Sequence, residues 1–387
     1  MTPEVSPARA RAVLVTLSLA AFAFVTTELL PVGLLTHLAS ELDRSRSRVG
    51  LLVSGYAVVV VLASVPLARM TRRVPRRHLL GLTMLLFAAA NGAAALAHTY
   101  AVLAGARLGT AAAQALFWSI ATATVIGPFP VAVRGRVVAL FATGATLAPV
   151  LGVPLGTWIG QQAGWRAAFA VLAGVGLAIA IAVFALLPTC PPAAGGGARG
   201  TAPDGRRFAV LLAATTLGIG GFLTLQTYIT PFLLDVSGFT EAALTPLLFT
   251  SGVAGVVGTL LAARTLDTRP VASLVTSLGV GAAALFGMYG LGTLPHGAVV
   301  CLAGLGLAYA AFASAVQNRM LHLAPGSTDI ASAGVSTAFN VGIAGGSLLG
   351  GALLPTSGAR VLALVGGLLT VAALVLLTRD ASRRRSG

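Results

Sequence analysis

Long runs of apolar residues, separated by short polar stretches, recur along the whole chain. A helix needs about 20 apolar residues to cross the hydrocarbon core of a membrane, and these runs have that length. We therefore predict twelve membrane-spanning helices. They cover residues 12–35, 49–67, 79–97, 101–126, 137–158, 167–187, 208–234, 242–263, 271–291, 298–316, 330–354 and 361–377.

A stretch rich in proline and glycine, residues 188–207, separates the sixth run from the seventh. It has no apolar periodicity, which is typical of a flexible linker. We predict one six-helix bundle over residues 1–187, a cytoplasmic linker, and a second six-helix bundle with a short basic tail over residues 208–387. Transporters built from two such repeats bind their substrate near the membrane midplane, between the halves.

The composition agrees with a membrane protein. Of the 387 residues, 57% are hydrophobic and 9% are charged, and the mean hydropathy is +0.93. Soluble proteins carry about 25% charged residues. We therefore predict an all-α membrane protein.

The net charge of +15 is the kind of excess that attracts nucleic acid, but its distribution indicates membrane topology instead. All 25 basic residues are arginines, and they cluster between the apolar runs. If the N-terminus is cytoplasmic, nineteen arginines fall on the cytoplasmic side and five outside. We therefore expect a multi-pass protein of the cell membrane with both termini in the cytoplasm and no nucleic-acid partner.

Two ionisable residues, Glu28 and Arg107, lie inside the predicted spans. A charge at the membrane centre costs about 2.5–3.5 kcal/mol on insertion scales, so such residues are candidates for function. Both lie about 10 Å from the outer ends of their spans at 1.5 Å per residue, so they could meet. We interpret Glu28 as a proton-coupling site with Arg107 as its partner. The alternative is a structural ion pair.

Several predicted spans also carry polar or aromatic residues that are candidates for substrate binding. Arg107, Ala111, Gln114 and Trp118 have helical spacing and are predicted to line a cavity. The amide and the indole suit sugars and drugs alike. Further candidates for substrate binding occur in the seventh and eleventh spans, and the alternative for all of them is helix packing; these candidates are Phe222, Gln226, Thr230 and Asn340.

The fifth span contains closely spaced glycines and prolines, which bend a helix and allow a close approach of its neighbours. We predict a compact, kinked packing surface there, formed by Gly144, Pro149, Gly152, Pro154 and Gly156. A glycine-rich stretch in the eleventh span is its counterpart and supports the repeat. The histidines lie at or beyond the span ends, and the chain has no lysine for a phosphate-binding loop. We expect no enzyme activity, no metal and no cofactor.

Several motifs together resemble the major facilitator superfamily, in its drug:proton antiporter branch, and within it most closely the bacterial sugar efflux transporters. They run in order along nearly the whole chain: TTELLPVGLL (26–35), GYAVVVVLASVP (55–66), ALFWSI (115–120), ATGATLAPVLGVPLG (142–156), GQQAGWRAAF (160–169), TYITPF (227–232), LAPGSTDIA (323–331) and FNVGIAGGSLLG (339–350). The resemblance implies two bundles that work by alternating access around a cavity lined by the first, fourth, seventh and tenth spans.

The resemblance also implies roles for individual residues. Glu28 matches the acidic residue of the first helix that is used in proton coupling, and Arg107 matches the arginine of the fourth-helix motif. The stretch around Pro149 matches the antiporter motif. The basic loop after the second helix, which braces the inside gate, contains Arg72, Arg73, Arg76 and Arg77.

Three residues depart from the family pattern. Arg72 stands where the superfamily has aspartate, Gln114 where sugar exporters tend to carry histidine, and Thr230 where they tend to carry glutamate. These departures leave Glu28 as the main candidate proton carrier.

We therefore expect a monomeric, proton-coupled exporter of small molecules, with sugars or sugar-like metabolites favoured. The bilayer, protons and the substrate are its expected partners. The alternatives are a multidrug or phenicol-type antibiotic exporter of the same fold, or a passive uniporter.

Overall fold

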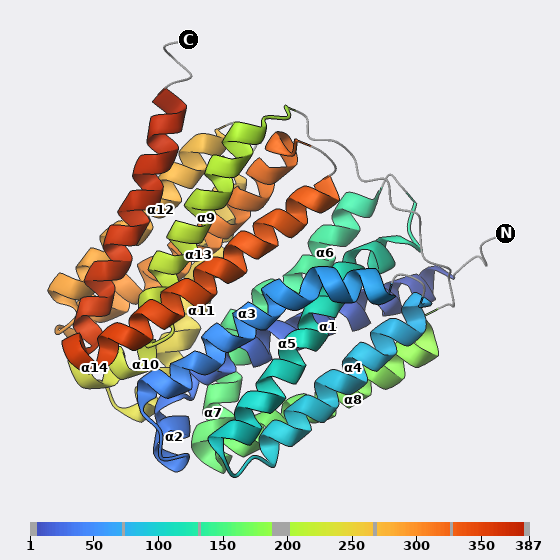
Figure 1. Cartoon of the computed structure of the whole chain (residues 1–387), viewed down its shortest axis with the longest axis horizontal. Coiled ribbons are helices and arrows are strands. Elements are labelled where there is room, and N and C mark those ends of the chain that lie inside the picture. The colour runs from blue at the N-terminus through green and yellow to red at the C-terminus, as the bar shows by residue number, and fades with distance from the viewer. Residues whose placement is uncertain are drawn as a thin grey trace. The chain divides into compact units, whose positions relative to one another are not determined.

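A computed structural model describes residues 6–71, 74–130, 133–187, 202–265, 269–325 and 328–382, and these ranges are helical nearly throughout (Figure 1). The predicted all-α fold is confirmed. Within the described residues, eleven helices are long and apolar enough to cross a membrane. The last of them, α14 (Thr328–Ser382), contains a non-helical residue at Gly358, which has a φ of 73° and divides it into two arms. The arms correspond to the last two predicted spans.

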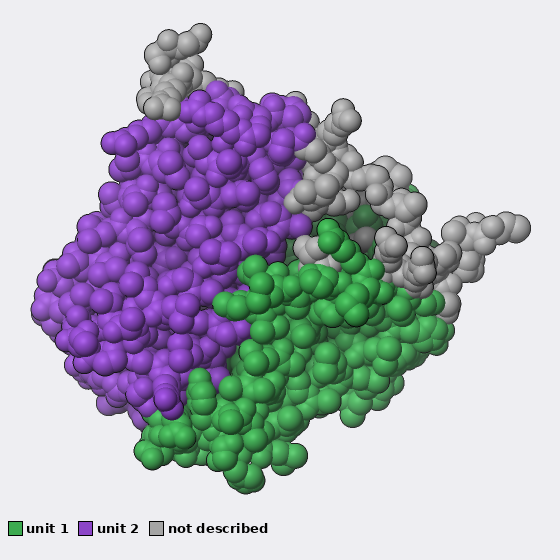
Figure 2. All heavy atoms as spheres, in the orientation of Figure 1, with its two compact units in different colours: residues 1–44, 58–194 green, residues 45–57, 195–387 purple. Residues whose placement is uncertain are grey.

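The chain forms two compact units, shown in green and purple in Figure 2. Unit 1 holds residues 1–44 and 58–194, and unit 2 holds residues 45–57 and 195–387. The first half of one predicted span, residues 49–57, therefore belongs with unit 2 although it precedes most of unit 1 in sequence.

The first part of the chain contains helices α1 to α8. Here α1 packs against α6, η2, α7 and α8, and α4 packs against α5 and α8. The bounds are α1 (Pro7–Gly33), α2 (Leu35–Glu41), α3 (Arg46–Thr71), α4 (Arg76–Ala95), α5 (Tyr100–Ile126), α6 (Arg134–Leu147), the π-helical turn η2 (Ala148–Gly152), α7 (Val153–Ala163) and α8 (Trp165–Leu186).

Unit 2 contains the remaining helices. In it α9 packs along α14, α11 packs against α13, and α12 packs against α13 and α14. The bounds are α9 (Gly205–Gln226), α10 (Ile229–Pro231), the π-helical turn η3 (Phe232–Val236), α11 (Glu241–Ala263), α12 (Pro270–Leu291) and α13 (Pro295–Leu323).

Three boundaries differ from the apolar pattern. The predicted seventh span is broken after Gln226, because Pro231 has no N–H to continue the helical hydrogen bonds. The fifth span is divided by η2, which contains Pro149. Residues 188–201 of the predicted linker lie outside the described residues. The last residues of the predicted linker already belong to a helix. There α9 begins at Gly205, because the Asp204 side chain accepts a hydrogen bond from the backbone N–H of Arg207.

Candidate functional site

Glu28 lies on α1 and its side chain is partly buried. The Nε2 atom of Gln114, on α5, donates a hydrogen bond to Glu28 Oε2 at 2.7 Å. Gln114 itself is only 3% exposed. The glutamate carboxyl is therefore held by an amide donor inside unit 1.

Arg107 lies two turns before Gln114 on the same face of α5 and is buried, with 1% of its surface exposed. Its Nη1 donates to the backbone oxygen of Thr27 at 2.5 Å, and its Nη2 donates to the backbone oxygen of Glu28 at 3.0 Å. The proximity of Arg107 to Glu28, predicted from their depths, is confirmed. Arg107 and Gln114 were predicted to share one face of α5. In the structure both contact the same turn of α1, which carries Thr27 and Glu28.

A proline explains why that turn of α1 can bind the guanidinium. In a helix the oxygen of Thr27 would accept the N–H of the fourth residue on, but that residue is Pro31, which has no N–H. The Thr27 oxygen is therefore left for Arg107. We name Glu28, Thr27, Arg107 and Gln114 the Glu28 cluster.

The glycines of the fifth span bring α6, η2 and α7 close to α1 on both sides of the Glu28 cluster. A Cβ atom added at Gly144 would clash with the backbone of Ser18, one at Gly152 with the side chain of Thr26, and one at Gly156 with that of Leu30. The helix is π-helical from Ala148 to Gly152 and includes Pro149, and Pro154 begins the next α-helical turn. The predicted close packing is confirmed, and it fixes the position of α1; at the predicted kink the structure has a π-helical turn.

The basic loop after the second predicted span is described in part. Arg76 Nη1 donates to Thr124 Oγ1 near the end of α5 at 3.4 Å, and Arg77 Nη2 donates to the backbone oxygen of Phe184 near the end of α8. These contacts connect the start of α4 to the ends of two other helices of unit 1. Arg72 and Arg73 lie outside the described residues.

The substrate-binding candidates fall in both units. In unit 1, Gln114 belongs to the Glu28 cluster, and Trp118 is partly exposed and contacts the rings of Phe117 and Phe141 at centroid distances of 5.3 and 5.8 Å. Their role in binding stays a prediction.

In unit 2, Phe222 is 3% exposed and packs edge-on against Tyr309 of α13 at 5.8 Å. Thr230 is 1% exposed within α10, and Gln226, at the end of α9, is partly exposed. Asn340, on α14, donates to the backbone oxygen of Ser336, and its own Oδ1 is buried without a partner. The structure thus places Phe222 and Thr230 in the protein interior, and it leaves a free acceptor at Asn340.

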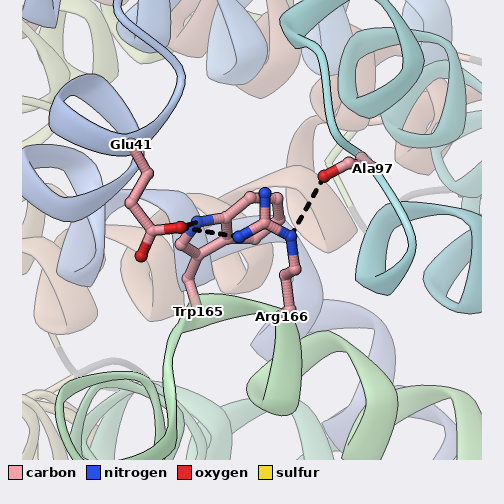
Figure 3. Close-up of polar contacts among 4 residues, drawn as sticks. All are labelled: Glu41, Ala97, Trp165 and Arg166. Atoms are coloured by element: carbon pink, nitrogen blue, oxygen red, sulfur yellow. Dashed lines mark hydrogen bonds and ion pairs between the residues drawn. The ribbon is translucent and has the colours of Figure 1, made fainter.

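A second polar cluster in unit 1 was not predicted (Figure 3). Glu41 Oε2 accepts hydrogen bonds from Trp165 Nε1 at 2.9 Å and from Arg166 Nη1 at 2.6 Å. Arg166 Nε donates to the backbone oxygen of Ala97, and its guanidinium lies 4.2 Å from the centre of the Trp165 ring. This cluster connects the end of α2, the turn after α4 and the start of α8.

Asn91 was also missed by the sequence analysis. It lies on α4, is 1% exposed, and accepts a hydrogen bond from the Thr27 hydroxyl at 2.8 Å. An amide in the middle of an apolar run is the signal that could have identified it.

Comparisons with known proteins agree with one another. The profile of the Major Facilitator Superfamily matches residues 16–328. Two bacterial proteins, each named "Probable sugar efflux transporter", are similar over most of the chain. The one from Mannheimia succiniciproducens is 35% identical over 93% of this chain and 91% of its own length, and the one from Pasteurella multocida is 34% identical over 94% and 90%.

Solved structures with the same fold have much lower sequence identity. The human organic anion transporter TETRAN has a TM-score of 0.69 at 17% identity, with 97% of this chain and 100% of that chain covered. A bacterial homolog of the human lysosomal transporter Spinster, in an inward-facing and unoccupied conformation, has a TM-score of 0.70 at 16% identity, with 97% and 96% covered.

Proposed function

The chain belongs to the major facilitator superfamily, and from this premise we propose that it exports sugars or sugar-like metabolites across the cytoplasmic membrane in exchange for protons. The family makes it a multi-pass membrane transporter. The substrate class is supported by relatives that are 34–35% identical over more than nine tenths of the chain and that carry the name of sugar efflux transporters.

The observation that carries proton coupling is the Glu28 cluster. Glu28 is a partly buried acid inside a membrane span, and Gln114 donates to its carboxyl oxygen. A hydrogen bond to a charged group is stronger than one to a neutral group. Proton uptake by Glu28 therefore weakens this bond and removes the attraction between the carboxylate and Arg107.

In the proposed cycle, the proton reaches Glu28 from outside and leaves it to the cytoplasm. Arg107 stays bound to the carbonyls of Thr27 and Glu28 through its own hydrogen bonds, so the charge on Glu28 changes while its surroundings stay in place. This change biases the switch between outward-open and inward-open states, and the substrate moves in the opposite direction. Such a mechanism needs a ligand that favours one state over the other, which the proton supplies.

We also propose that both termini lie in the cytoplasm, on the strength of the arginine distribution, and that the transporter acts as a monomer. Candidate substrate contacts are the partly exposed side chains of Trp118 and Gln226 and the unpartnered Oδ1 of Asn340. An acceptor such as this oxygen suits a sugar hydroxyl, which can donate to it.

The test is transport of a labelled pentose or galactoside by purified protein in proteoliposomes, with and without an imposed pH gradient. The proposal predicts uphill sugar movement that requires the gradient. Movement that is only downhill and indifferent to pH would support a passive uniporter. If no sugar moves while a phenicol antibiotic does, the sugar assignment is wrong and the drug exporter is correct.

A further inference from the structure

The hydroxyl of Thr27 connects Arg107 to a third helix. Thr27 Oγ1 donates to Asn91 Oδ1 on α4 at 2.8 Å and accepts from Arg107 Nη1 at 3.3 Å. Thr27 is 0% exposed and Asn91 is 1% exposed. These bonds therefore form where water does not compete for them.

The direction of each of these hydrogen bonds follows from the bond that Asn91 makes within its own helix. The Asn91 Nδ2 donates to the backbone oxygen of Phe87 on the same helix at 2.9 Å, which fixes the orientation of the amide. Its Oδ1 therefore faces Thr27 and can only accept, so the hydroxyl of Thr27 must donate to it. The lone pairs of that hydroxyl then remain for Arg107.

Arg107 is thus held by Thr27 through two atoms. One is the backbone oxygen that Pro31 leaves without a helical donor, and the other is the hydroxyl that Asn91 orients. Away from the helix ends, Glu28 and Arg107 are the ionisable residues of the described helices of unit 1. The position of the guanidinium therefore decides the electrostatic surroundings of Glu28.

We propose that Asn91 and Thr27 are positioning residues for proton coupling, which fix Arg107 beside Glu28 so that proton uptake is tied to the conformational switch. This inference rests on the proposed function. Without the hydroxyl, the guanidinium keeps its bonds to the two backbone oxygens but loses the bond that Asn91 orients, so its position beside Glu28 is less closely fixed. Glu28 then exchanges protons without driving the substrate.

The test compares uphill and downhill transport in proteoliposomes for Thr27→Val, which has nearly the same shape as threonine but no hydroxyl. We expect uphill accumulation to fall roughly tenfold, the order expected for loss of a hydrogen bond to a charged group, while downhill exchange stays within about twofold of the wild type. Thr27→Ser, which keeps the hydroxyl, should restore coupling. Asn91→Leu should uncouple in the same way, and the double variant should be no worse than Thr27→Val, because both act through one contact.

A matched control is Thr83→Val on α4. Thr83 is 2% exposed and its hydroxyl donates to Leu79 on its own helix, so its loss should leave the ratio of uphill to downhill transport unchanged. If Thr27→Val lowers both kinds of transport equally, the residue is merely structural and the inference is wrong. If Glu28→Gln abolishes uphill transport but Thr27→Val does not, the proposed function stands and the inference fails. If Glu28→Gln keeps uphill transport, the proposed function itself fails.

Discussion

The membrane penalty of an acidic residue is reduced at Glu28 by the hydrogen bond from Gln114. A charge at mid-membrane costs about 2.5–3.5 kcal/mol on insertion scales, and a hydrogen bond to a charged group contributes about 1.5–3 kcal/mol. The bond from Gln114 is thus of the same order as the penalty. The amide is therefore expected to control how readily Glu28 exists in its ionised form.

This argument predicts the effect of Gln114→Leu. The variant removes the donor at Glu28 Oε2 but keeps a side chain of similar size in a buried place. Gradient-driven efflux should fall by about tenfold or more, in line with the loss of a charge-assisted hydrogen bond. The measurement is uphill accumulation in proteoliposomes. Gln114→His keeps an N–H donor and should retain much of the activity; equal losses in both variants would contradict the role of the donor.

The sequence was enough to identify part of this site. Glu28 and Arg107 stand out because charges are rare inside apolar runs, and helical spacing placed Gln114 on the face of Arg107. Thr27 and Asn91 could not be connected in the same way. Their contact depends on how α1 and α4 are rotated toward one another, and the apolar pattern of each helix does not determine that rotation.

At the scale of elements, α1 is fixed by the glycines of its neighbours. The contacts at Gly144, Gly152 and Gly156 follow α1 from Ser18 to Leu30 and enclose the turn that carries Glu28. Small residues let helix backbones approach closely in a membrane. The position of α1 therefore depends on the presence of glycine, which has no side chain, at these three places in the neighbouring segments.

Gly144→Ala tests this dependence with one added methyl group. Its Cβ would clash with the backbone of Ser18, which cannot rotate away as a side chain can. Overpacking of this kind costs about 1–3 kcal/mol, so we expect a lower unfolding temperature in detergent and reduced transport. The matched control is Gly105→Ala on α5, where nothing lies within 4 Å of the added atom. A Gly144 variant as stable and active as this control would contradict the close packing.

Helix interruptions were harder to predict than helices. The glycines and prolines of the fifth span predicted a bend, but the pattern does not distinguish a π-helical turn at Ala148–Gly152 from a simple kink. The seventh span was predicted as one helix, yet it breaks after Gln226. Pro231 is visible in the sequence, but the prolines inside α1, α3 and α11 leave those helices continuous, so a proline alone does not predict a break. The buried hydrogen bonds from Thr227 and Tyr228 to Ser347 on α14 at this break are not visible in a single sequence.

At the scale of the whole molecule, the same kinds of helix contact occur in each unit. In unit 2, Gly342, Gly346 and Gly350 of α14 approach the backbone of α9, as the glycines of the fifth span approach α1.

A second repeated feature is a glycine followed by an arginine. Gly164 and Gly358 both have positive φ and both precede an arginine by two residues. Arg166 Nε donates to the backbone oxygen of Ala97, and Arg360 Nε to that of Tyr289. The glycine part of this repeat was predicted, and the arginine part was not.

The arginine asymmetry predicts the orientation of the whole chain. Fusions of green fluorescent protein and of alkaline phosphatase to the C-terminus report cytoplasmic and external locations respectively. We expect fluorescence and no phosphatase activity, because the predicted spans place nineteen arginines on the side of the termini and five on the other. The reverse pattern would show that the orientation is wrong.

Proton movement itself tests the central claim most directly. Proteoliposomes with a trapped pH-sensitive dye are given an outward gradient of a transported sugar, and the internal pH is followed for the wild type and for Glu28→Gln. We predict that sugar flow drives protons in the opposite direction in the wild type, and that the variant moves sugar downhill without moving protons. Proton movement at the wild-type rate in Glu28→Gln would contradict the account.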